Sequence, residues 1–214
     1  MSGAELLSNP KLIFWDFDGV IKDSVEVKSR GFANLFQAFG GAVKERVLQH
    51  HRANGGMSRF DKVPLYLNWA GLKADPDKVA EYCDKFSQLV LQEVIDAPWV
   101  AGVEAYIRDN PNRQKFILVS ATPQNELAYI LHALNLTNCF AKVFGAPTCK
   151  KDAIRITLEA CKYKLHDCLM IGDAQTDLDA AQANGVPFLL RWNDANTDML
   201  TNYNGPSIRD LSEL

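Results

Sequence analysis

LIFWDFDGV, residues 12–20, is the stretch of sequence that decides the fold. The apolar run Leu12–Trp15 predicts a short buried strand, and two aspartates one residue apart follow at its end. Side chains at positions i and i+2 of an extended segment point to the same side, so Asp16 and Asp18 can face one pocket. Two carboxylates in one pocket repel each other unless a cation compensates them, and oxygen ligands of this kind suit Mg²⁺.

The Asp-x-Asp pattern has two other interpretations when it is taken alone. One is a turn with two solvated aspartates, and the other is the metal site of a sugar-nucleotide transferase. A second acidic pair bears on this choice, because Asp173 follows the apolar run Cys168–Ile171 and Asp177 lies one helical turn further on. The helix dipole explains one aspartate at a helix start, but it does not explain acidic pairs after two strands. Their convergence favours a metal site.

Short apolar runs alternate with helical patterns over most of the chain. Besides the two strands already named, the strand candidates are Phe116–Val119, Lys142–Gly145 and Val186–Arg191. This alternation predicts an α/β fold, with a Rossmann-like, mainly parallel five-stranded sheet and helices on both faces. Ligands of such sheets bind beyond the carboxyl ends of the strands, where Ser120 and Asp173 are expected.

Residues 23–97 break this alternation, because they carry several helix signals and no convincing strand. The first of these signals is Asp23 with Glu26, which have the spacing of a capping box. We therefore expect a small all-helical cap domain at residues 23–97. It is inserted into a Rossmann-like catalytic core that is formed by residues 1–22 and 98–214.

Composition limits the classes of function. The 214 residues are 47% hydrophobic and 23% charged, with a net charge of −3, which is typical of a globular protein without general affinity for nucleic acids. No apolar run approaches the roughly 18 residues of a membrane helix, and the N-terminus predicts no secretory signal. The five cysteines form no Cys-x-x-Cys pair and are expected to be reduced. We expect a cytoplasmic monomer or homodimer that binds neither nucleic acid nor membrane.

Four motifs, taken together, resemble the haloacid dehalogenase superfamily, in the subgroup with a helical cap inserted after the first motif. In chain order they are Asp16–Ser24, Val119–Thr122, Lys150 and Gly172–Asp177. Each motif alone has low specificity, but the order and the separations of the four motifs are similar to those of the family. The resemblance implies a Rossmann-like core, a mobile cap, a Mg²⁺ cofactor and phosphoryl transfer through an aspartyl-phosphate.

The resemblance also implies a role for each motif residue. Asp16 is the expected nucleophile, and Asp18 is the expected general acid and base. Ser120 is expected to donate a hydrogen bond to the phosphoryl oxygens, and Lys150 to offset their charge, with the neighbouring Lys151 as a competitor for this role. The expected metal ligands are Asp16, Asp18 through its backbone carbonyl, Asp173, and Asp177 through a water or a supporting bond.

Candidates for substrate binding come from both domains. In the core they are Gly19 and Ala121, and a glycine at position 19 allows backbone amides to approach the phosphoryl oxygens. In the cap, residues 44–62 contain five basic and two acidic side chains, although the whole chain is slightly acidic. This segment is either a solvated turn or, as in related capped enzymes, a loop that reads the substrate. In the second case the contacts are expected from Gly56, Ser58 and Arg59.

The resulting prediction is a Mg²⁺-dependent phosphatase that hydrolyses a small phosphorylated metabolite, such as a sugar phosphate or a phosphoglycolate-like acid. The presence of Asp18 favours phosphate-monoester chemistry. True dehalogenases lack this second aspartate, and phosphonate hydrolases carry a small apolar residue in its place. One alternative is a phosphomutase of the β-phosphoglucomutase type, and another is a non-catalytic binding protein on the same fold.

Overall fold

A computed structural model describes residues 3–212 of the chain. The chain divides into two compact units, one formed by Met1–Asp23 with Pro98–Leu214 and the other by Ser24–Ala97. Within the described residues, no helix is both long enough and apolar enough to cross a membrane.

The larger unit is built on a parallel sheet with the strand order β3-β2-β1-β4-β5-β6. Its strands are β1 (Leu12–Trp15), β2 (Lys115–Pro123), β3 (Lys142–Ala146), β4 (Cys168–Gly172), β5 (Phe188–Arg191) and β6 (Ser207–Ile208). The predicted α/β class is confirmed, but the predicted count of five strands is wrong. The additional strand, β6, has two residues and pairs with the end of β5. A strand of two residues is too short to show a period-two pattern in the sequence.

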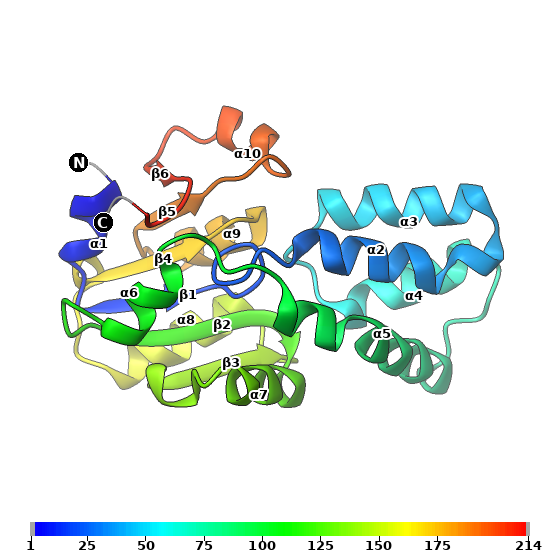
Figure 1. Ribbon diagram of the computed structural model, residues 1–214, viewed down its shortest axis with the longest axis horizontal. Helices are drawn as coiled ribbons and strands as arrows, with labels where there is room; N and C mark the ends of the chain where they lie inside the picture. The colour runs from blue at the N-terminus through cyan, green and yellow to red at the C-terminus, as the bar shows by residue number, and fades with distance from the viewer. Residues whose placement is uncertain (1–2, 213–214) are drawn as a thin grey trace. The chain divides into compact units, whose positions relative to one another are not determined.

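Helices cover both faces of this sheet. They are α1 (Gly3–Ser8), α6 (Val103–Asp109), α7 (Gln124–Ala133), α8 (Lys150–Ala160), α9 (Gln175–Ala183) and α10 (Thr197–Asn202), with 3₁₀ turns at Thr137–Cys139 and Leu165–Asp167. In Figure 1, α6 and α7 lie in front of the sheet and α8 lies behind it. Parallel strands need such crossover connections, which explains the alternation of strand and helix in the sequence.

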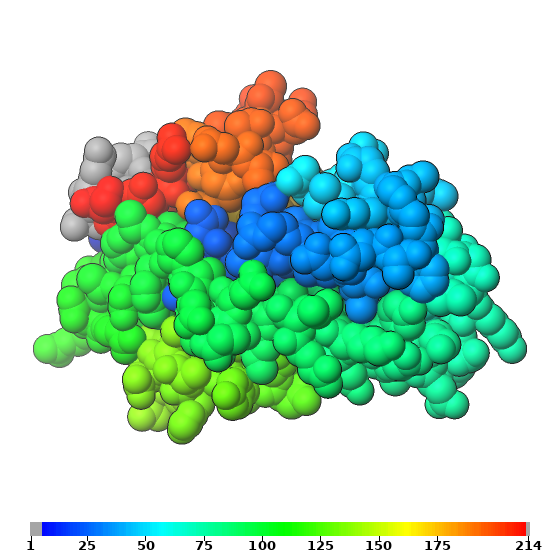
Figure 2. All heavy atoms as spheres, turned by 45° about the vertical axis from the view of Figure 1, so that its right-hand side comes forward, coloured from blue at the N-terminus to red at the C-terminus, as the bar shows by residue number. Residues whose placement is uncertain are grey.

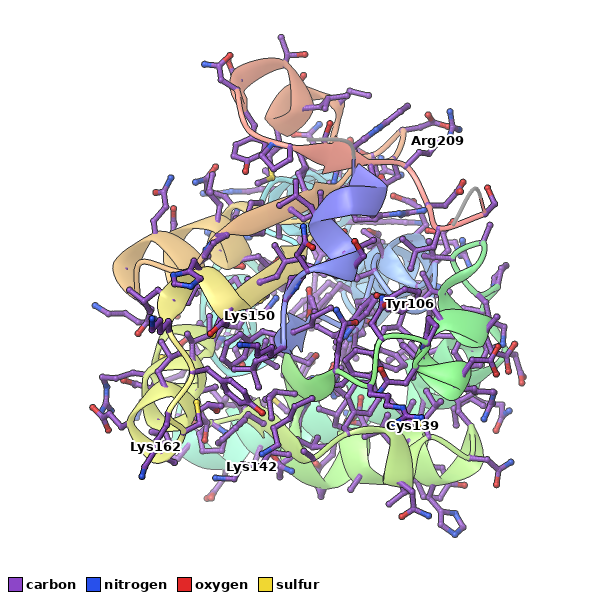
Figure 3. The ribbon with its side chains drawn as sticks, turned by 90° about the vertical axis from the view of Figure 1, so that its left-hand side faces the viewer. Tyr106, Cys139, Lys142, Lys150, Lys162 and Arg209 are labelled. Atoms are coloured by element: carbon purple, nitrogen blue, oxygen red, sulfur yellow. The ribbon has the colours of Figure 1, made fainter. Side chains whose placement is uncertain are left out.

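The two faces of β1 belong to two different apolar layers, because successive side chains of a strand point in opposite directions. Leu12 and Phe14 contribute to the cluster that contains side chains of α8 and α9. Trp15 instead packs against Phe116, with ring centroids 5.6 Å apart, and against Tyr106 of α6, at 6.0 Å. Figure 3 labels Tyr106, whose hydroxyl lies 3.0 Å from the carbonyl oxygen of Leu7. Burial on both faces therefore makes β1 the centre of the core.

The end of the described chain returns to the start of α6. The backbone N–H of Leu211 donates to the carbonyl of Ala101 at 2.9 Å. A side chain at Gly102 would collide with the Leu211 backbone, and Gly102 also has a positive φ of 75°. Figure 2 shows this C-terminal segment, in red, beside the green part of the chain that contains α6.

The smaller unit contains four α-helices within the described residues. They are α2 (Val25–Leu35), α3 (Gly41–Ala53), α4 (Arg59–Trp69) and α5 (Pro76–Asp96), with a 3₁₀ turn at Gln37–Phe39. The predicted capping box at Asp23 is wrong. The first helix begins at Val25, and Ser24 occupies the N-cap position without a capping hydrogen bond from its side chain. The helix therefore starts one residue later than the Asp23–Glu26 spacing indicates.

Aromatic stacking forms the centre of this helical unit. Phe32 of α2 stacks on Phe86 of α5 with ring centroids 3.8 Å apart, and Tyr66 of α4 meets Phe32 edge-on at 5.3 Å. The α2–α5 contact is close at Gly31, where an added Cβ would lie 2.2 Å from the Cγ1 of Val90. A small residue at position 31 is what allows the two aromatic rings to stack.

Candidate active site

The strand order brings together three motifs that are far apart in the sequence. Because β1 lies between β2 and β4, the carboxyl ends of these three strands meet at one edge of the sheet. Asp16 directly follows β1, Ser120 lies near the end of β2, and Asp173 directly follows β4. Lys150 begins α8, and Asp177 lies in the first turn of α9.

A buried lysine joins two of the aspartates. The Nζ of Lys150 lies 2.8 Å from the Oδ2 of Asp16 and 2.6 Å from the Oδ1 of Asp177. The other oxygen of Asp16 accepts a hydrogen bond from the backbone N–H of Phe17 at 2.7 Å. Figure 3 labels Lys150 among the side chains at the centre of this unit. Lys151, the competing candidate, is exposed, so Lys150 is the lysine that the fold brings to the aspartates.

Asp16, Asp173 and Asp177 form a cluster in which one carboxylate oxygen of each residue lies within 4.8 Å of the others. The position of Asp177 depends on the glycine that ends β4. An added Cβ at Gly172 would lie 2.2 Å from the Cβ of Asp177. The second oxygen of Asp177 accepts from the backbone N–H of Ala174 at 3.2 Å. The end of β4 and the start of α9 therefore jointly fix the position of the Asp177 carboxylate.

Burial and mutual repulsion change the protonation of the cluster. Burial raises the pKa of Asp16 to about 7, with Asp177 and Asp18 adding to the rise while Lys150 opposes it. Burial, Asp16 and Asp177 raise the pKa of Asp173 well above its usual value. Burial disfavours the charged form of Lys150, but the two neighbouring carboxylates outweigh it and raise its pKa. The lysine therefore stays cationic, and one cation does not balance three carboxylates.

The donor set fits a divalent metal ion. Three carboxylates within 4.8 Å of one another offer hard oxygen ligands. The pKa values of Asp16 and Asp173 are raised by burial first and by the neighbouring carboxylates in addition. Mg²⁺ and similar hard cations bind sites of this chemistry, usually through a few carboxylates. The Asp18 carboxylate does not belong to this cluster within residues 3–212. Ligation by the Asp18 backbone carbonyl stays a prediction.

Asp18 has a different set of neighbours from Asp16. Its Oδ2 accepts a hydrogen bond from the hydroxyl of Thr122 at 3.3 Å, and the backbone N–H of Thr122 donates to the Oγ of Ser120 at 3.1 Å. Both Ser120 and Thr122 are buried. They lie where the pairing of β2 with β3 is interrupted, between Val119 and Pro123. The end of β2 is therefore irregularly paired with β3. It is at this irregular end that the side chain of Thr122 contacts Asp18.

The two core candidates for substrate binding come from the segments that meet at Asp18, since Gly19 follows it in the chain and Ala121 precedes Thr122, which contacts it. Gly19 has a φ of 77°, a left-handed conformation that favours glycine, and its own N–H donates to the carbonyl of Lys22 at 2.7 Å. The Gly19 amide is thus used within the turn. Ala121 lies in the interrupted part of β2 and is partly exposed. A substrate contact at either residue stays a prediction.

Two of the three cap candidates, Arg59 and Ser58, have contacts of their own within the helical unit. Arg59 is buried, its guanidinium donates to the Oγ of Ser87, and it lies 4.7 Å from the ring centroid of Phe86. Ser58 caps α4 by accepting from the N–H of Phe60 at 3.3 Å. Gly56 lies in the turn before this helix. These contacts give Arg59 and Ser58 a role in building the cap, and their contact with substrate stays a prediction.

The structure adds residues that the sequence reasoning did not assign to the site. Thr122 belongs to the second motif but was given no role, and its hydroxyl contacts Asp18. Arg191 and Asn196 lie outside all four motifs and bond to the backbones of Gly19 and Asp173. The only sequence signal for Arg191 is a charged residue at the end of an apolar strand, and Asn196 carries none.

Comparison with known proteins agrees with this geometry. A family model described as haloacid dehalogenase-like hydrolase matches residues 10–185. A phosphoglycolate phosphatase of Mesorhizobium japonicum is 29% identical over 196 residues, which cover 85% of this chain and 82% of the relative. Among solved structures, β-phosphoglucomutase from Clostridium difficile has a TM-score of 0.75 at 19% identity, with 96% of this chain and 93% of that chain covered. CbbY from Rhodobacter sphaeroides in complex with xylulose-(1,5)bisphosphate has a TM-score of 0.73 at 14% identity, with 96% of each chain covered.

The fold and the site define an enzyme of the Rossmann-like α/β type, with its site at the carboxyl ends of parallel strands. The chain belongs to the haloacid dehalogenase-like hydrolase family, since the family model covers most of its length. It is therefore a hydrolase, and the family resemblance inferred from the four motifs is confirmed. The family generally uses a divalent metal ion, which agrees with the carboxylate cluster.

Proposed function

We propose that the chain is a Mg²⁺-dependent phosphatase that hydrolyses a small phosphorylated metabolite through an aspartyl-phosphate on Asp16. The position of the Asp16 carboxylate carries this proposal. It follows the central strand, pairs with Lys150 at 2.8 Å and lies within 4.8 Å of two further carboxylates. Asp18, two residues later, belongs to a separate hydrogen-bonded group, which leaves it available for proton transfer.

In the proposed site, Asp16 and Asp173 would hold Mg²⁺ with the backbone carbonyl of Asp18, and Asp177 would support it through a water or a supporting bond. Bound Mg²⁺ would neutralise charge on the phosphoryl group and favour the ionised form of Asp16. Lys150 adds a second positive charge that the protein itself supplies.

The first chemical step transfers the phosphoryl group to the protein. A carboxylate oxygen of Asp16 attacks phosphorus, and the bond between phosphorus and the substrate oxygen breaks. Asp18 in its protonated form gives its proton to the leaving oxygen. The products of this step are an alcohol, an Asp16 phosphate and an ionised Asp18.

The second step restores the enzyme. Asp18, now a carboxylate, takes a proton from a water molecule whose oxygen attacks the phosphorus of the Asp16 phosphate. The bond between phosphorus and the Asp16 oxygen breaks, which releases inorganic phosphate and regenerates the Asp16 carboxylate. In both steps Ser120 donates a hydrogen bond to the phosphoryl oxygens, while Gly19 and Ala121 leave room beside them.

The substrate class in this proposal is a small phosphorylated acid or sugar. Support comes from the relatives: one is named phosphoglycolate phosphatase, and another was solved with a sugar bisphosphate. The cap is proposed to read the rest of the substrate through Gly56, Ser58 and Arg59. A guanidinium such as that of Arg59 is suited to bind two oxygens of an anionic group.

The test separates the roles of the two aspartates. Asp16→Asn removes the nucleophile, so it should abolish both phosphate release from p-nitrophenyl phosphate and formation of a phosphorylated Asp16 peptide. Asp18→Asn keeps the nucleophile but loses proton transfer, a contribution of roughly 10²–10⁴-fold in turnover. With this good leaving group it should still form the phosphorylated peptide, visible by mass spectrometry, and hydrolyse it slowly.

Asp179→Asn is the matched control, because Asp179 is exposed on α9 and accepts a hydrogen bond from Gln175. This variant should behave as the wild type. Near-normal activity of Asp16→Asn would exclude the covalent mechanism. No Mg²⁺-dependent phosphate release from a broad panel of phosphomonoesters by the wild type would exclude a phosphatase. Transfer of the phosphoryl group within a sugar phosphate, without its release, would indicate a mutase instead.

A further inference from the structure

The segment that follows the family match reaches back to the candidate site. The family model ends at residue 185, while β5, α10 and β6 lie beyond it. Two side chains of this segment, those of Arg191 and Asn196, donate hydrogen bonds to backbone carbonyls of the first and last motifs. All these residues belong to the larger unit.

Arg191 joins the turn after β1 to the C-terminal strand. It is the last residue of β5 and only 8% exposed. Its Nη1 donates to the carbonyl of Gly19 at 3.0 Å, and its Nε donates to the carbonyl of Arg209 at 3.0 Å. The Oδ1 of Asp23 lies 3.9 Å from the same Nη1. One planar guanidinium therefore bridges three segments of the chain.

The turn that Arg191 contacts carries the proposed acid and base. Within it, the N–H groups of Val20, Ile21 and Lys22 all donate to the carbonyl of Phe17. These bonds close the turn on itself but do not anchor it to a neighbouring element. Neighbouring segments anchor the turn at Asp18, through the hydroxyl of Thr122, and at the carbonyl of Ile21, which accepts from the N–H of Val100 at 3.0 Å. The bond from Arg191 to the Gly19 carbonyl adds an anchor from the C-terminal segment, directly beside Asp18.

Asn196 acts in a similar way on the last motif. Its side-chain amide donates to the carbonyl of Asp173 at 2.7 Å and to the carbonyl of Arg191 at 3.0 Å. Its Oδ1 accepts from the N–H of Asn193 at 2.7 Å. The polar atoms of this side chain thus connect the loop after β5 to the residue after β4.

Acidic neighbours and hydrogen bonds stabilise the positive charge of Arg191 at its buried position. Burial lowers its pKa, whereas Asp23, Asp173 and Asp210 favour its charged form, and Arg209 opposes it. Burying a guanidinium costs free energy that an apolar side chain would not incur. The bonds to Gly19 and Arg209, together with three acidic neighbours, offset that cost.

We propose that Arg191 and Asn196 are positioning residues, with Arg191 holding the turn that carries Asp18 and Asn196 holding the backbone of Asp173. Arg191 is suited to this task because its rigid fork serves two carbonyls at once, which a lysine ammonium does not reproduce. The consequences for catalysis rest on the proposed function, but the effects on the turn and on metal binding do not.

The first experiment measures hydrogen exchange of the backbone amides in the wild type, Arg191→Met and Arg191→Lys. In Arg191→Met, loss of a charge-assisted hydrogen bond should speed exchange in residues 17–22 by about tenfold or more. Arg191→Lys, which keeps the charge, should give a smaller increase and serves as the milder variant if Arg191→Met does not fold. Unchanged exchange of this turn in both variants would overturn the role of Arg191.

Arg209→Met is the matched control. The Arg209 side chain is 59% exposed and pairs with Asp194, whereas only its backbone carbonyl contacts Arg191. Figure 3 labels this residue in the C-terminal segment. Its removal should leave exchange of residues 17–22 as in the wild type. An equal increase in Arg209→Met would attribute the effect to general loosening of the C-terminal segment and overturn the specific role of Arg191.

The second experiment measures Mn²⁺ binding without substrate, by the electron paramagnetic resonance signal of the free ion. Asn196→Ala should weaken binding by about tenfold, since Asp173 loses a backbone anchor. Asn202→Ala, which removes an exposed bond to the carbonyl of Asp198, should not change it. Wild-type affinity in a folded Asn196→Ala variant would overturn the role of Asn196.

Turnover of p-nitrophenyl phosphate links these results to the proposed function. Arg191→Lys should lower kcat with little change in KM, because the turn positions Asp18 and does not itself hold the substrate. An unchanged kcat together with faster exchange of the turn would overturn the catalytic consequence while leaving the positioning intact. Absence of activity in the wild type would contradict the proposed function, and the exchange and Mn²⁺ experiments would still decide the positioning roles.

Discussion

At the scale of single residues, Lys150 supplies the positive charge that pairs with two buried carboxylates of the site. Its ammonium lies between the carboxylates of Asp16 and Asp177, and all three side chains are buried. Removing one partner of a buried ion pair leaves the other charge uncompensated, which typically costs about 3–5 kcal/mol. The same ammonium is positioned to offset charge on a phosphoryl group that is transferred to Asp16.

We predict that Lys150→Met lowers turnover by at least about 10²-fold and also lowers the thermal unfolding midpoint. Lys151→Met is the matched control, because Lys151 is exposed on the same helix and should be replaceable with no effect on either measurement. Phosphate release and thermal melting of the two variants would check this. Equal losses in both variants, or a loss only in Lys151→Met, would contradict the assignment of Lys150.

At the scale of secondary-structure elements, the contact between α3 and α4 contains a buried histidine next to a buried lysine. The Nζ of Lys62 lies 2.9 Å from the Nδ1 of His51, and both side chains are almost fully buried. Burial lowers the pKa of His51 well below its usual value, and the neighbouring basic residues Lys62, Lys28, His50 and Arg52 lower it further. The imidazole is therefore neutral and accepts a hydrogen bond from the ammonium.

This histidine makes the helical unit sensitive to acid. Below about pH 6.5 the unfolded chain takes up a proton at His51 that the folded chain excludes, so stability falls as the pH falls. We predict that His51 contributes a loss of about 1.4 kcal/mol per pH unit below that value. Asp16 and Asp173 contribute in the opposite direction, because their raised pKa values let the folded chain bind protons that the unfolded chain does not bind. His51→Gln keeps an acceptor without the titration, so thermal melting between pH 5 and pH 8 should show the variant gaining stability relative to the wild type as the pH falls.

His132→Gln provides the comparison, because His132 is exposed on α7 and the same substitution there should leave the pH profile of the wild type intact. A difference in stability between His51→Gln and the wild type that stays constant from pH 8 to pH 5 would contradict the role of His51.

At the scale of the whole molecule, the clustered carboxylates belong to one of the two units. Asp16, Asp173 and Asp177 all lie in the unit formed by Met1–Asp23 and Pro98–Leu214. A ligand that binds only the folded state stabilises it by mass action, by about 2.7 kcal/mol at a concentration one hundred times its Kd. A cation would also remove the repulsion among these carboxylates.

We therefore predict that Mg²⁺ raises the thermal unfolding midpoint of the wild type in a concentration-dependent way. Asp173→Asn should lose most of this effect, whereas Asp179→Asn should keep it, because Asp179 is exposed and outside the cluster. Melting curves in a series of Mg²⁺ concentrations are the measurement. An unchanged response in Asp173→Asn would place the metal elsewhere.

The sequence alone determined the α/β class, the family and the carboxylates that follow β1 and β4. These features are local: a buried strand shows as an apolar run, and polar residues directly after it belong to the carboxyl edge of the sheet. The same local logic failed at the start of α2, where a capping pattern at Asp23 competed with the actual start at Val25. It also failed for β6, whose two residues have no pattern of their own.

The tertiary structure decided which of these residues meet. Strand order places β1 between β2 and β4. The packing of α8 then brings Lys150, and not its exposed neighbour Lys151, to Asp16 and Asp177. Strand order also brings Arg191 and Asn196 to the turn and the strand end that carry the site. Contacts between distant segments depend on how strands pair and helices pack. The hydrophobic periodicity or the motif of a single segment does not predict such contacts. Sequence supplies the chemical groups of the site, whereas the packing of the sheet supplies their distances.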